Sequence, residues 1–259
     1  MRSPADFTDP DRLRDQYADS DRFRVRVETH QRYSERKTDF LDWIVDQLDV
    51  EPGQRVADIG CGPGNYFSRL AARGAHVVGS DLSPGMAREA RNAGFPTVVA
   101  DAQFLPFAAA SFERVMCSHV LYHVPDQRRA LIELRRIGRP GARVLLTTNG
   151  ADHLKAFYDV TRLAAADIRF DLPARRISPF TLEDVDVVAE VFPGVEVKRR
   201  ENCLVFPDPE PAMDYLRSWI GTTGPLENAM RVRMAEAIDR DGSFRVPTVA
   251  GCFLAEVSG

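Results

Sequence analysis

The chain has 259 residues, of which 44% are hydrophobic and 28% are charged, and its net charge is 34 − 38 = −4. This composition is that of an ordinary globular protein, long enough for one large α/β domain. The mildly acidic balance argues against a broad basic surface, so we expect no nucleic-acid partner.

Cysteine usage and hydropathy indicate a cytoplasmic protein. The cysteines stand singly, without a C-x-x-C pair or a nearby histidine, so we expect neither a metal site nor a disulfide framework. They are Cys61, Cys117, Cys203 and Cys252. No apolar run approaches the roughly 20 residues that span a bilayer, and the first residues lack the apolar core of a signal peptide. We therefore expect no membrane association, and the sequence does not indicate an oligomeric state.

Residues 1–50 are expected to form a helical cap, because apolar side chains recur there at helical spacing. Phe23, Val27 and His30 form one such set, and a second set follows over 40–48. The charges of this segment alternate in sign, which indicates solvated helix faces rather than a basic arm. A main domain is expected over 51–259.

From about residue 55, β-branched runs alternate with helical stretches. Five strands are expected, over 55–60, 75–81, 96–101, 112–120 and 142–149. Ser83 and Pro84 are a helix N-cap and a first-turn proline, and Gly94 ends that helix. Asp126 caps the next helix, which ends at Gly138. This alternation predicts βαβ units, with a parallel sheet covered by helices on both faces.

Beyond Gly150 the pattern becomes less regular. A helix is expected over 151–168, and Thr181 with Asp184 forms a capping box that opens another. Two late strands are expected over 195–206 and 246–257. Between them, residues 208–241 are expected to form a helical insertion before the last strand.

The stretch VADIGCGPGN, residues 56–65, places three glycines in a turn after the first strand, where backbone N–H groups can approach a ligand. A dinucleotide fingerprint would need G-x-G-x-x-G, but Asn65 stands where the third glycine belongs. Pro63 also removes a donor that a pyrophosphate would use, and no Lys-Ser or Lys-Thr pair follows for a P-loop. Asp58 would repel phosphate and attract an ammonium group, although it could equally brace the turn by accepting backbone N–H bonds.

Several motifs of the chain together resemble the class I S-adenosylmethionine-dependent methyltransferases. VADIGCGPG resembles the first motif of that family, V-L-D-[IVL]-G-C-G-x-G. VVGSDLSPGM, ADAQFLPF and FERVMCSHVLYHVPD follow in the family's order and spacing, and RRIGRPGARVLLTTNG departs from the fifth motif only at Gly138 and Ala142. The resemblance is strong over residues 50–150 and general beyond them.

This resemblance implies a Rossmann-like methyltransferase fold: α/β, with a doubly wound, mostly parallel seven-stranded sheet and helices on both faces. It implies S-adenosylmethionine as the cofactor, with its homocysteine part on the glycine loop, its ribose at Asp81 and its adenine between Leu82 and Met86. The residues it assigns to the cofactor are Asp58, Gly60, Cys61, Gly62, Gly64, Asp81, Leu82, Met86, Asp101, Ala102, Ser118 and His119. From the cap, Tyr17, Arg24 and Tyr33 are further candidates, as is Tyr66 beyond the glycine loop.

Methyl transfer from a sulfonium requires alignment and, for a hydroxyl or acidic carbon, a general base, most often histidine. The candidates are His119, His123 and His153, which follow the fourth and fifth strands. Each also has a structural explanation: His123 could fix a turn, His119 could contact the cofactor through its backbone, and His153 could start a surface helix.

The acceptor is expected to be a small molecule, methylated on O, C or N. The fourth strand ends in SHVL rather than [ND]-P-P-[YF], which presents exocyclic amines in the amino methyltransferases. Two other functions stay open: a non-catalytic S-adenosylmethionine-binding or partner-binding protein, and an NAD(P)-dependent oxidoreductase.

Overall fold

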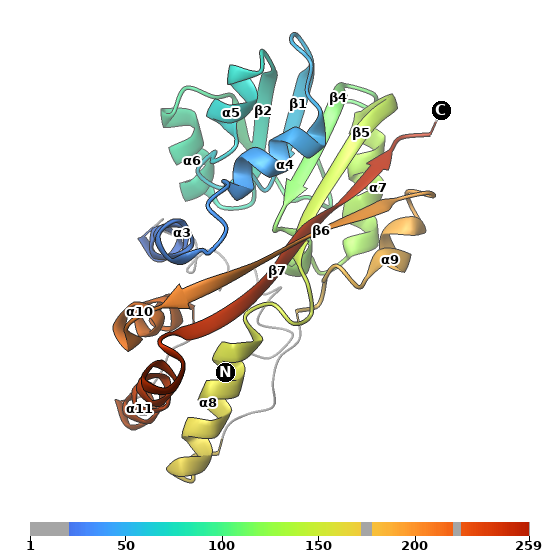
Figure 1. Cartoon of the computed structure of the whole chain (residues 1–259). Helices are drawn as coiled ribbons and strands as arrows, with labels where there is room; N and C mark the ends of the chain where they lie inside the picture. The colour runs from blue at the N-terminus through green and yellow to red at the C-terminus, as the bar shows by residue number, and fades with distance from the viewer. Residues whose placement is uncertain (1–20, 172–177, 220–223, 259) are drawn as a thin grey trace.

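The computed structural model describes residues 21–171, 178–219 and 224–258, which form a single twisted sheet with helices around it (Figure 1). The strands of this described part are β1 (Arg55–Ile59), β2 (His76–Asp81), β3 (Thr97–Val99), β4 (Phe112–Ser118), β5 (Gly138–Asn149), β6 (Glu196–Phe206) and β7 (Phe244–Glu256). Their order in the sheet is β3-β2-β1-β4-β5-β7-β6. β1 to β5 run parallel, and β7 runs antiparallel to both of its neighbours. The expected fold class is confirmed.

Helices pack on both faces of the sheet. The helices of the described residues are α3 (Asp21–Tyr33), α4 (Phe40–Leu48), α5 (Phe67–Ala72), α6 (Pro84–Asn92), α7 (Gln127–Ile137), α8 (Lys155–Asp167), α9 (Val185–Ala189), α10 (Pro209–Trp219) and α11 (Gly224–Asp241), with a 3₁₀ turn η1 (Leu121–His123). One face of the sheet carries α7 and α9, and the other carries α4, α5 and α6. None of the described helices is both long enough and apolar enough to cross a membrane.

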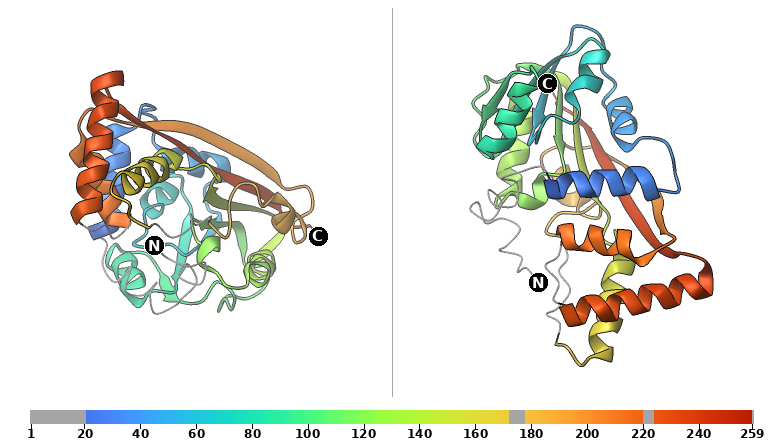
Figure 2. Two further views of the ribbon diagram at one scale, coloured as in Figure 1. Left: turned by 90° about the horizontal axis from the view of Figure 1, so that it is seen from below. Right: turned by 90° about the vertical axis from the view of Figure 1, so that its left-hand side faces the viewer.

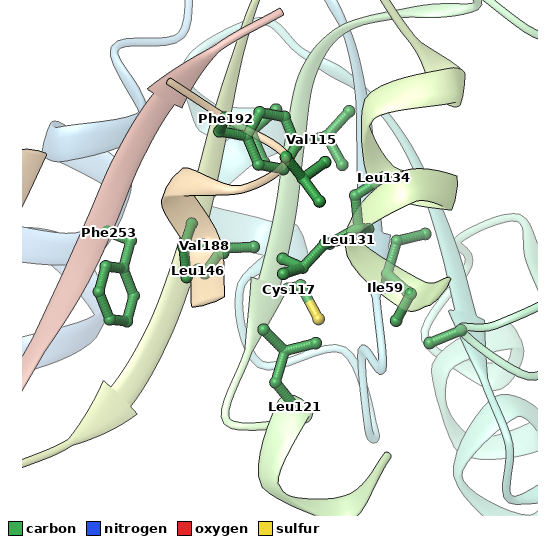
Figure 3. Close-up of a cluster of buried hydrophobic side chains, with 14 of the residues drawn as sticks. Ile59, Val115, Cys117, Leu121, Leu131, Leu134, Leu146, Val188, Phe192 and Phe253 are labelled. Carbon is green, nitrogen blue, oxygen red and sulfur yellow. The ribbon is translucent and has the colours of Figure 1, made fainter. Parts of the chain in front are cut away.

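Alternating side chains of the strands supply two separate cores, as expected of a sheet buried on both faces. Val115 and Cys117 of β4 point to the α7 face, where they meet Leu131 and Leu134 (Figure 3). Met116, between them in sequence, points to the opposite face and packs in the core beneath α4 and α5. The central strands β1 and β4 therefore have no exposed face.

A second helical layer lies beyond the carboxyl ends of the parallel strands. Figures 1 and 2 show α8, α10 and α11 grouped below the sheet, with α3 alongside them. Their apolar faces share one core with the ends of β6 and β7, in which Phe157, Phe206 and Met213 are fully buried. Two long antiparallel strands thus extend from the sheet and carry the helices that face its carboxyl edge.

The predicted helix starts are confirmed in detail for two helices. The Ser83 hydroxyl accepts a hydrogen bond from the Met86 N–H at 3.3 Å, with Pro84 in the first turn of α6. The Asp126 carboxylate accepts from the Arg129 N–H at 2.8 Å at the start of α7. Both caps satisfy amide groups that the helix itself leaves unpaired.

Two predicted boundaries differ from the structure. Thr181 and Asp184 do bond to each other, since the Thr181 N–H and hydroxyl both donate to Asp184 Oδ2, at 2.7 and 2.8 Å. They close a turn that precedes α9, and Asp184 does not cap the helix with its side chain. α7 ends at Ile137, but Gly138 has a φ of −72° and begins β5 directly, so no left-handed glycine ends that helix.

Candidate functional site: the carboxyl edge of the sheet

The strand order reverses between β1 and β4, which in open α/β sheets is the place where ligands bind. The glycine loop begins here, directly after β1. The N–H groups of Gly60 and Cys61 both donate to the Ser80 carbonyl oxygen, at 2.7 and 3.0 Å, and so tie the loop to the end of β2. Gly60, Gly62 and Gly64 all have positive φ values, of +72°, +56° and +90°. The bare backbone predicted from the sequence is therefore required by the turn itself.

Gly60 and Gly62 are glycines for different reasons. A Cβ on Gly60 would lie 2.1 Å from Val120 Cγ2, so the loop after β4 packs directly against it. A Cβ on Gly62 would meet no atom within 4 Å. Gly62 therefore faces open space, and a ligand can approach its backbone there.

Asp58 is the most unusual group at this edge. Its side chain is 0% exposed, and neither carboxylate oxygen has a hydrogen-bond partner among the described residues. Burial first, and then the neighbouring Asp81, raise the pKa of Asp58 to about 8. An unpaired buried carboxylate is costly, so this position favours a cationic or hydrogen-bond-donating ligand. The alternative that Asp58 braces the turn by accepting backbone N–H bonds finds no support here.

Asp81 ends β2 beside the same loop. Its carboxylate accepts hydrogen bonds from the N–H groups of Gly62 and Ser83, each at 2.8 Å. Burial raises the pKa of Asp81, and these two hydrogen bonds partly offset that rise. The carboxylate is thus held between the glycine loop and the first turn of α6.

The residues expected around an adenine ring gather close to Asp81. Met86 is buried in the first turn of α6, and the Ala100 N–H donates to the Asp81 carbonyl oxygen at 3.0 Å, which brings the segment after β3 beside β2. The Asp101 carboxylate accepts from the N–H and the Nε2 of Gln103. Ala102 is buried and Leu82 is half-buried.

The end of β4 is linked to the glycine loop through hydroxyl groups. Ser118 Oγ lies 2.9 Å from the Tyr66 hydroxyl and 2.7 Å from Thr147 Oγ1. His119 follows with a φ of +58°, and its N–H donates to the Thr147 carbonyl oxygen at 3.0 Å. Such a backbone conformation is uncommon outside glycine and is often found at functional sites. Tyr66 is buried, and its hydroxyl lies beside Ser118 at the end of β4.

The candidate histidines lie in different surroundings. The ring of His119 lies beside those of Phe40 and Tyr122, at 6.2 and 6.3 Å between centroids. His153 Nδ1 lies 3.0 Å from the Val249 carbonyl oxygen. In η1, the N–H of His123 donates to the Val120 carbonyl oxygen, and its ring packs edge-on against that of Tyr122.

The candidates from the N-terminal cap lie in different surroundings. Tyr17 lies outside the described residues. Arg24 is exposed on α3, and the ring of Tyr33 packs against Phe206 in the helical layer, 5.0 Å between centroids. The Cys61 thiol points into the core beneath α4 and α5.

His30 and Tyr215 are polar residues of this region that the sequence did not single out as site residues. His30 Nε2 of α3 lies 3.4 Å from the Tyr215 hydroxyl of α10. The two residues are 185 positions apart, and both fall within helical patterns typical of packing faces. Thr147 could have been identified from the sequence, since it is a polar residue at the end of an apolar strand.

Comparison with known proteins agrees with this geometry. Residues 57–146 match a family model described as a methyltransferase domain. This part of the chain is therefore a methyltransferase domain. Demethylmenaquinone methyltransferase of Corynebacterium efficiens is 37% identical over 99 residues, which are 38% of this chain and 43% of that protein. The similarity therefore spans less than half of that relative.

Solved structures of methyltransferases share the fold. A proposed methyltransferase of Bacillus halodurans C-125 superposes with a TM-score of 0.62 at 17% identity, over 85% of this chain and 99% of that one. Phosphoethanolamine N-methyltransferase 2 of Haemonchus contortus, in complex with phosphomonomethylethanolamine and S-adenosylhomocysteine, superposes with a TM-score of 0.57 at 19% identity. That match covers 100% of this chain and 61% of the other. At these identities the likeness establishes the fold of the methyltransferase domain.

Within the described residues, no group of three or more His, Cys, Asp or Glu side chains is arranged to hold a metal ion. The four cysteines are all buried free thiols. The groups at the edge of the methyltransferase domain are two carboxylates, several hydroxyls and histidines, beside a glycine loop that is open at Gly62.

Proposed function

We propose that this protein transfers a methyl group from S-adenosylmethionine to a small-molecule acceptor. The observation that carries the proposal is Asp58, a fully buried carboxylate without a hydrogen-bond partner beside a glycine loop. The ammonium group of the cofactor's amino-acid end would supply the missing partner, whereas the phosphates of a nicotinamide dinucleotide would be repelled. When bound, S-adenosylmethionine supplies a methyl group on a sulfonium.

The residues of the chain can hold each part of this cofactor. The open side of Gly62 admits the homocysteine backbone, and Asp81 stands where the ribose hydroxyls would be bound. Met86 and Leu82, with Asp101 and Ala102, would surround the adenine. Ser118 and His119, at the end of β4, would lie beneath the methionine part, as the family resemblance implies.

We further propose that the cap helices α3 and α4, together with α8, α10 and α11, enclose the acceptor and exclude water from it. α3 lies against α10, on the carboxyl side of the sheet (Figure 2). The relative from Corynebacterium efficiens, named for a quinone substrate, supports an acceptor of that size. The four buried thiols support a reducing, cytoplasmic setting.

Calorimetric titration with S-adenosylhomocysteine, NADH and NADPH tests the cofactor assignment. We expect binding of S-adenosylhomocysteine alone, with an affinity in the micromolar range. Asp58→Asn should weaken that binding at least about tenfold, equivalent to about 1.4 kcal/mol, because a charged partner of the ammonium group is lost. Asp159→Asn, an exposed carboxylate on α8 that pairs with Lys155, is the matched control and should bind as the wild type does.

The same variant separates a ligand role from a structural one. Without ligand, Asp58→Asn should unfold at a higher temperature than the wild type at pH 8 and above, because it removes a buried charge. A variant that is less stable and binds equally well would show that Asp58 serves the fold. Binding of a nicotinamide cofactor instead would overturn the proposed function.

A further inference from the structure

The segment between β3 and β4 is held to α7 through its backbone. The Leu105 N–H donates to the buried carboxylate of Glu133 at 2.8 Å. The Arg136 guanidinium donates to the carbonyl oxygens of Leu105 and Phe107, at 3.0 and 2.7 Å. Glu133 and Arg136 also pair with each other at 2.7 Å. The residues that we assign to the adenine, Asp101 and Ala102, therefore lie on a segment whose course is fixed by a helix.

Gln103 connects this segment to the Asp101 carboxylate. Its backbone N–H donates to Asp101 Oδ1 at 2.8 Å, and its Nε2 lies 3.0 Å from each of the two Asp101 oxygens. A carboxylate only accepts hydrogen bonds, and each of its oxygens can accept about two. Oδ2 receives a single contact from Gln103, so it can accept a second donor. Gln103 therefore fixes the orientation of the carboxylate and leaves Oδ2 able to bind a ligand.

The side-chain amide of Gln103 is itself oriented by the start of α7. The Asp126 N–H donates to Gln103 Oε1 at 3.1 Å. Because an N–H group must meet the oxygen of the amide, this bond turns the NH₂ group of the amide toward Asp101. The Gln103 carbonyl oxygen also accepts from Arg129 Nε at 3.2 Å, and the Arg129 guanidinium lies over the Phe104 ring, 5.3 Å from its centroid. The donor that faces Asp101 is thus set by α7.

The backbone closes this turn without the Gln103 side chain. The Phe104 N–H donates to the Asp101 carbonyl oxygen at 2.9 Å, and the Ala100 N–H donates to the Asp81 carbonyl oxygen at 3.0 Å. These bonds tie the segment to the end of β2, where we place the ribose. The effect that is left to the Gln103 amide is the orientation of the Asp101 carboxylate.

We propose that Gln103 is a positioning residue that makes the site selective for a 6-aminopurine, because it holds Asp101 Oδ2 as the acceptor for the amino group of the cofactor's base. The inference rests on the proposed function, in which Asp101 borders the adenine. Adenine presents an N–H donor at its 6-position, whereas a 6-oxopurine presents a carbonyl oxygen there. A carbonyl oxygen facing a fixed carboxylate is repelled and leaves that carboxylate without its partner, so the site rejects this analogue.

Calorimetric titration with S-adenosylhomocysteine and S-inosylhomocysteine measures this selectivity, because the second ligand has a carbonyl oxygen in place of the 6-amino group. We expect the wild type to bind S-adenosylhomocysteine at least about 100-fold more tightly. Gln103→Met has a similar length but no N–H donor, and it should reduce this ratio at least about tenfold, which corresponds to about 1.4 kcal/mol. If Gln103 served only the fold, its loss would weaken both ligands alike and leave the ratio unchanged.

Gln127→Met is the matched control. Gln127 lies in the first turn of α7, and its Nε2 donates to the Pro179 carbonyl oxygen at 3.0 Å. This variant should keep the wild-type ratio.

Gln103→Glu is the second variant, which keeps the test open if Gln103→Met fails to fold. It retains the length of the side chain and an acceptor for the Asp126 N–H, but it places a second carboxylate beside Asp101. It should reduce the ratio at least as far as Gln103→Met does. An unchanged ratio in either folded Gln103 variant, or equal binding of the two ligands by the wild type, would overturn this inference alone. Absence of S-adenosylhomocysteine binding would instead refute the proposed function.

Discussion

At Gly62, the effect of a substitution on ligand binding can be measured separately from its effect on the conformation of the turn. Its φ of +56° lies in the left-handed region that alanine can adopt at a cost of about 1–2 kcal/mol. Its Cβ would contact nothing in the protein, yet it would occupy the side on which we place the homocysteine part. We therefore expect Gly62→Ala to fold and to lose at least about tenfold in affinity for S-adenosylhomocysteine, or about 1.4 kcal/mol, as measured by calorimetry.

Gly53→Ala is the control for backbone strain. Gly53 has a φ of +84°, its Cβ would also meet no atom within 4 Å, and it lies before β1, at the opposite end of that strand from Gly62. Both variants should lower the melting temperature, and only Gly62→Ala should lose affinity. Equal affinities in the two variants would contradict the placement of the cofactor.

At the residue scale, the sequence predicted what lies close along the chain. Asp58, Asp81 and the glycines could be placed at one edge because each lies at or just after the end of its own strand, and parallel strands end at the same edge. His30 and Tyr215 were not found as site residues. Their contact depends on how α3 and α10 pack against each other, and neither helix carries a local signal for that packing.

Among the elements, β6 fixes the N-terminal cap through Arg200. This guanidinium is largely buried, donates to the carbonyl oxygens of Thr38 and Asp39, and lies over the rings of Phe40 and Trp43. It therefore holds the connection between α3 and α4 in place. We expect Arg200→Met to lower the free energy of unfolding by about 2–3 kcal/mol, because two carbonyl groups lose a charged donor; denaturant titration measures this.

Arg199→Met is the neighbouring control on the same strand. Arg199 is half exposed and pairs with Glu183 at 2.9 Å, and surface pairs of this kind contribute about 0–1 kcal/mol. A loss in Arg199→Met as large as that in Arg200→Met would show that the effect belongs to the strand rather than to the buried guanidinium.

The boundaries of elements were predictable where the side chains decide them locally. Ser83 and Asp126 cap their helices because a short polar side chain can reach an amide two or three residues ahead. The start of β5 at Gly138 was not predictable in this way. The chain passes from helix to strand there without a turn, and the pairing of Gly138 with Phe112 of β4 determines it.

For the whole molecule, the order of apolar strands and helices was enough to predict the doubly wound sheet and its helices on both faces. The hydrophobic pattern did not predict one effect of the length of β6 and β7. Their far ends pair beyond the parallel strands, from Val205 with Arg245 to Phe206 with Phe244, and so carry α10 and α11 out over the carboxyl edge. The position of the helical layer depends on this long-range pairing.

The titrating groups of the site should give the unliganded protein a stability maximum near pH 6.5. Burial lowers the pKa of three histidines from 6.5 to about 3–4, so each binds a proton more readily when unfolded over that range. They are His30, His119 and His153. Their contribution to stability is present above pH 6.5 and is lost as the pH falls. Asp58 acts in the opposite sense. Its pKa is raised from 3.8 to about 8, so its contribution is present at low pH and is lost as the pH rises toward 8.

The difference in bound protons between the unfolded and folded states predicts how steeply the free energy of unfolding changes with pH on each side of this maximum. Between about pH 4 and 6.5 the unfolded chain binds three protons on these histidines that the folded protein does not, and the folded protein binds one on Asp58 that the unfolded chain does not. The unfolded state therefore binds two more protons, and stability should rise by up to about 2.7 kcal/mol per pH unit. Of these four groups, only Asp58 titrates between pH 6.5 and 8, and it should lower stability by up to about 1.4 kcal/mol per pH unit there. Denaturant titrations across this range measure both limbs. His30→Gln should reduce the acid slope by about one proton, and Asp58→Asn should flatten the alkaline limb; a profile that both variants leave unchanged would contradict the assignment, because the slopes would then arise from other groups.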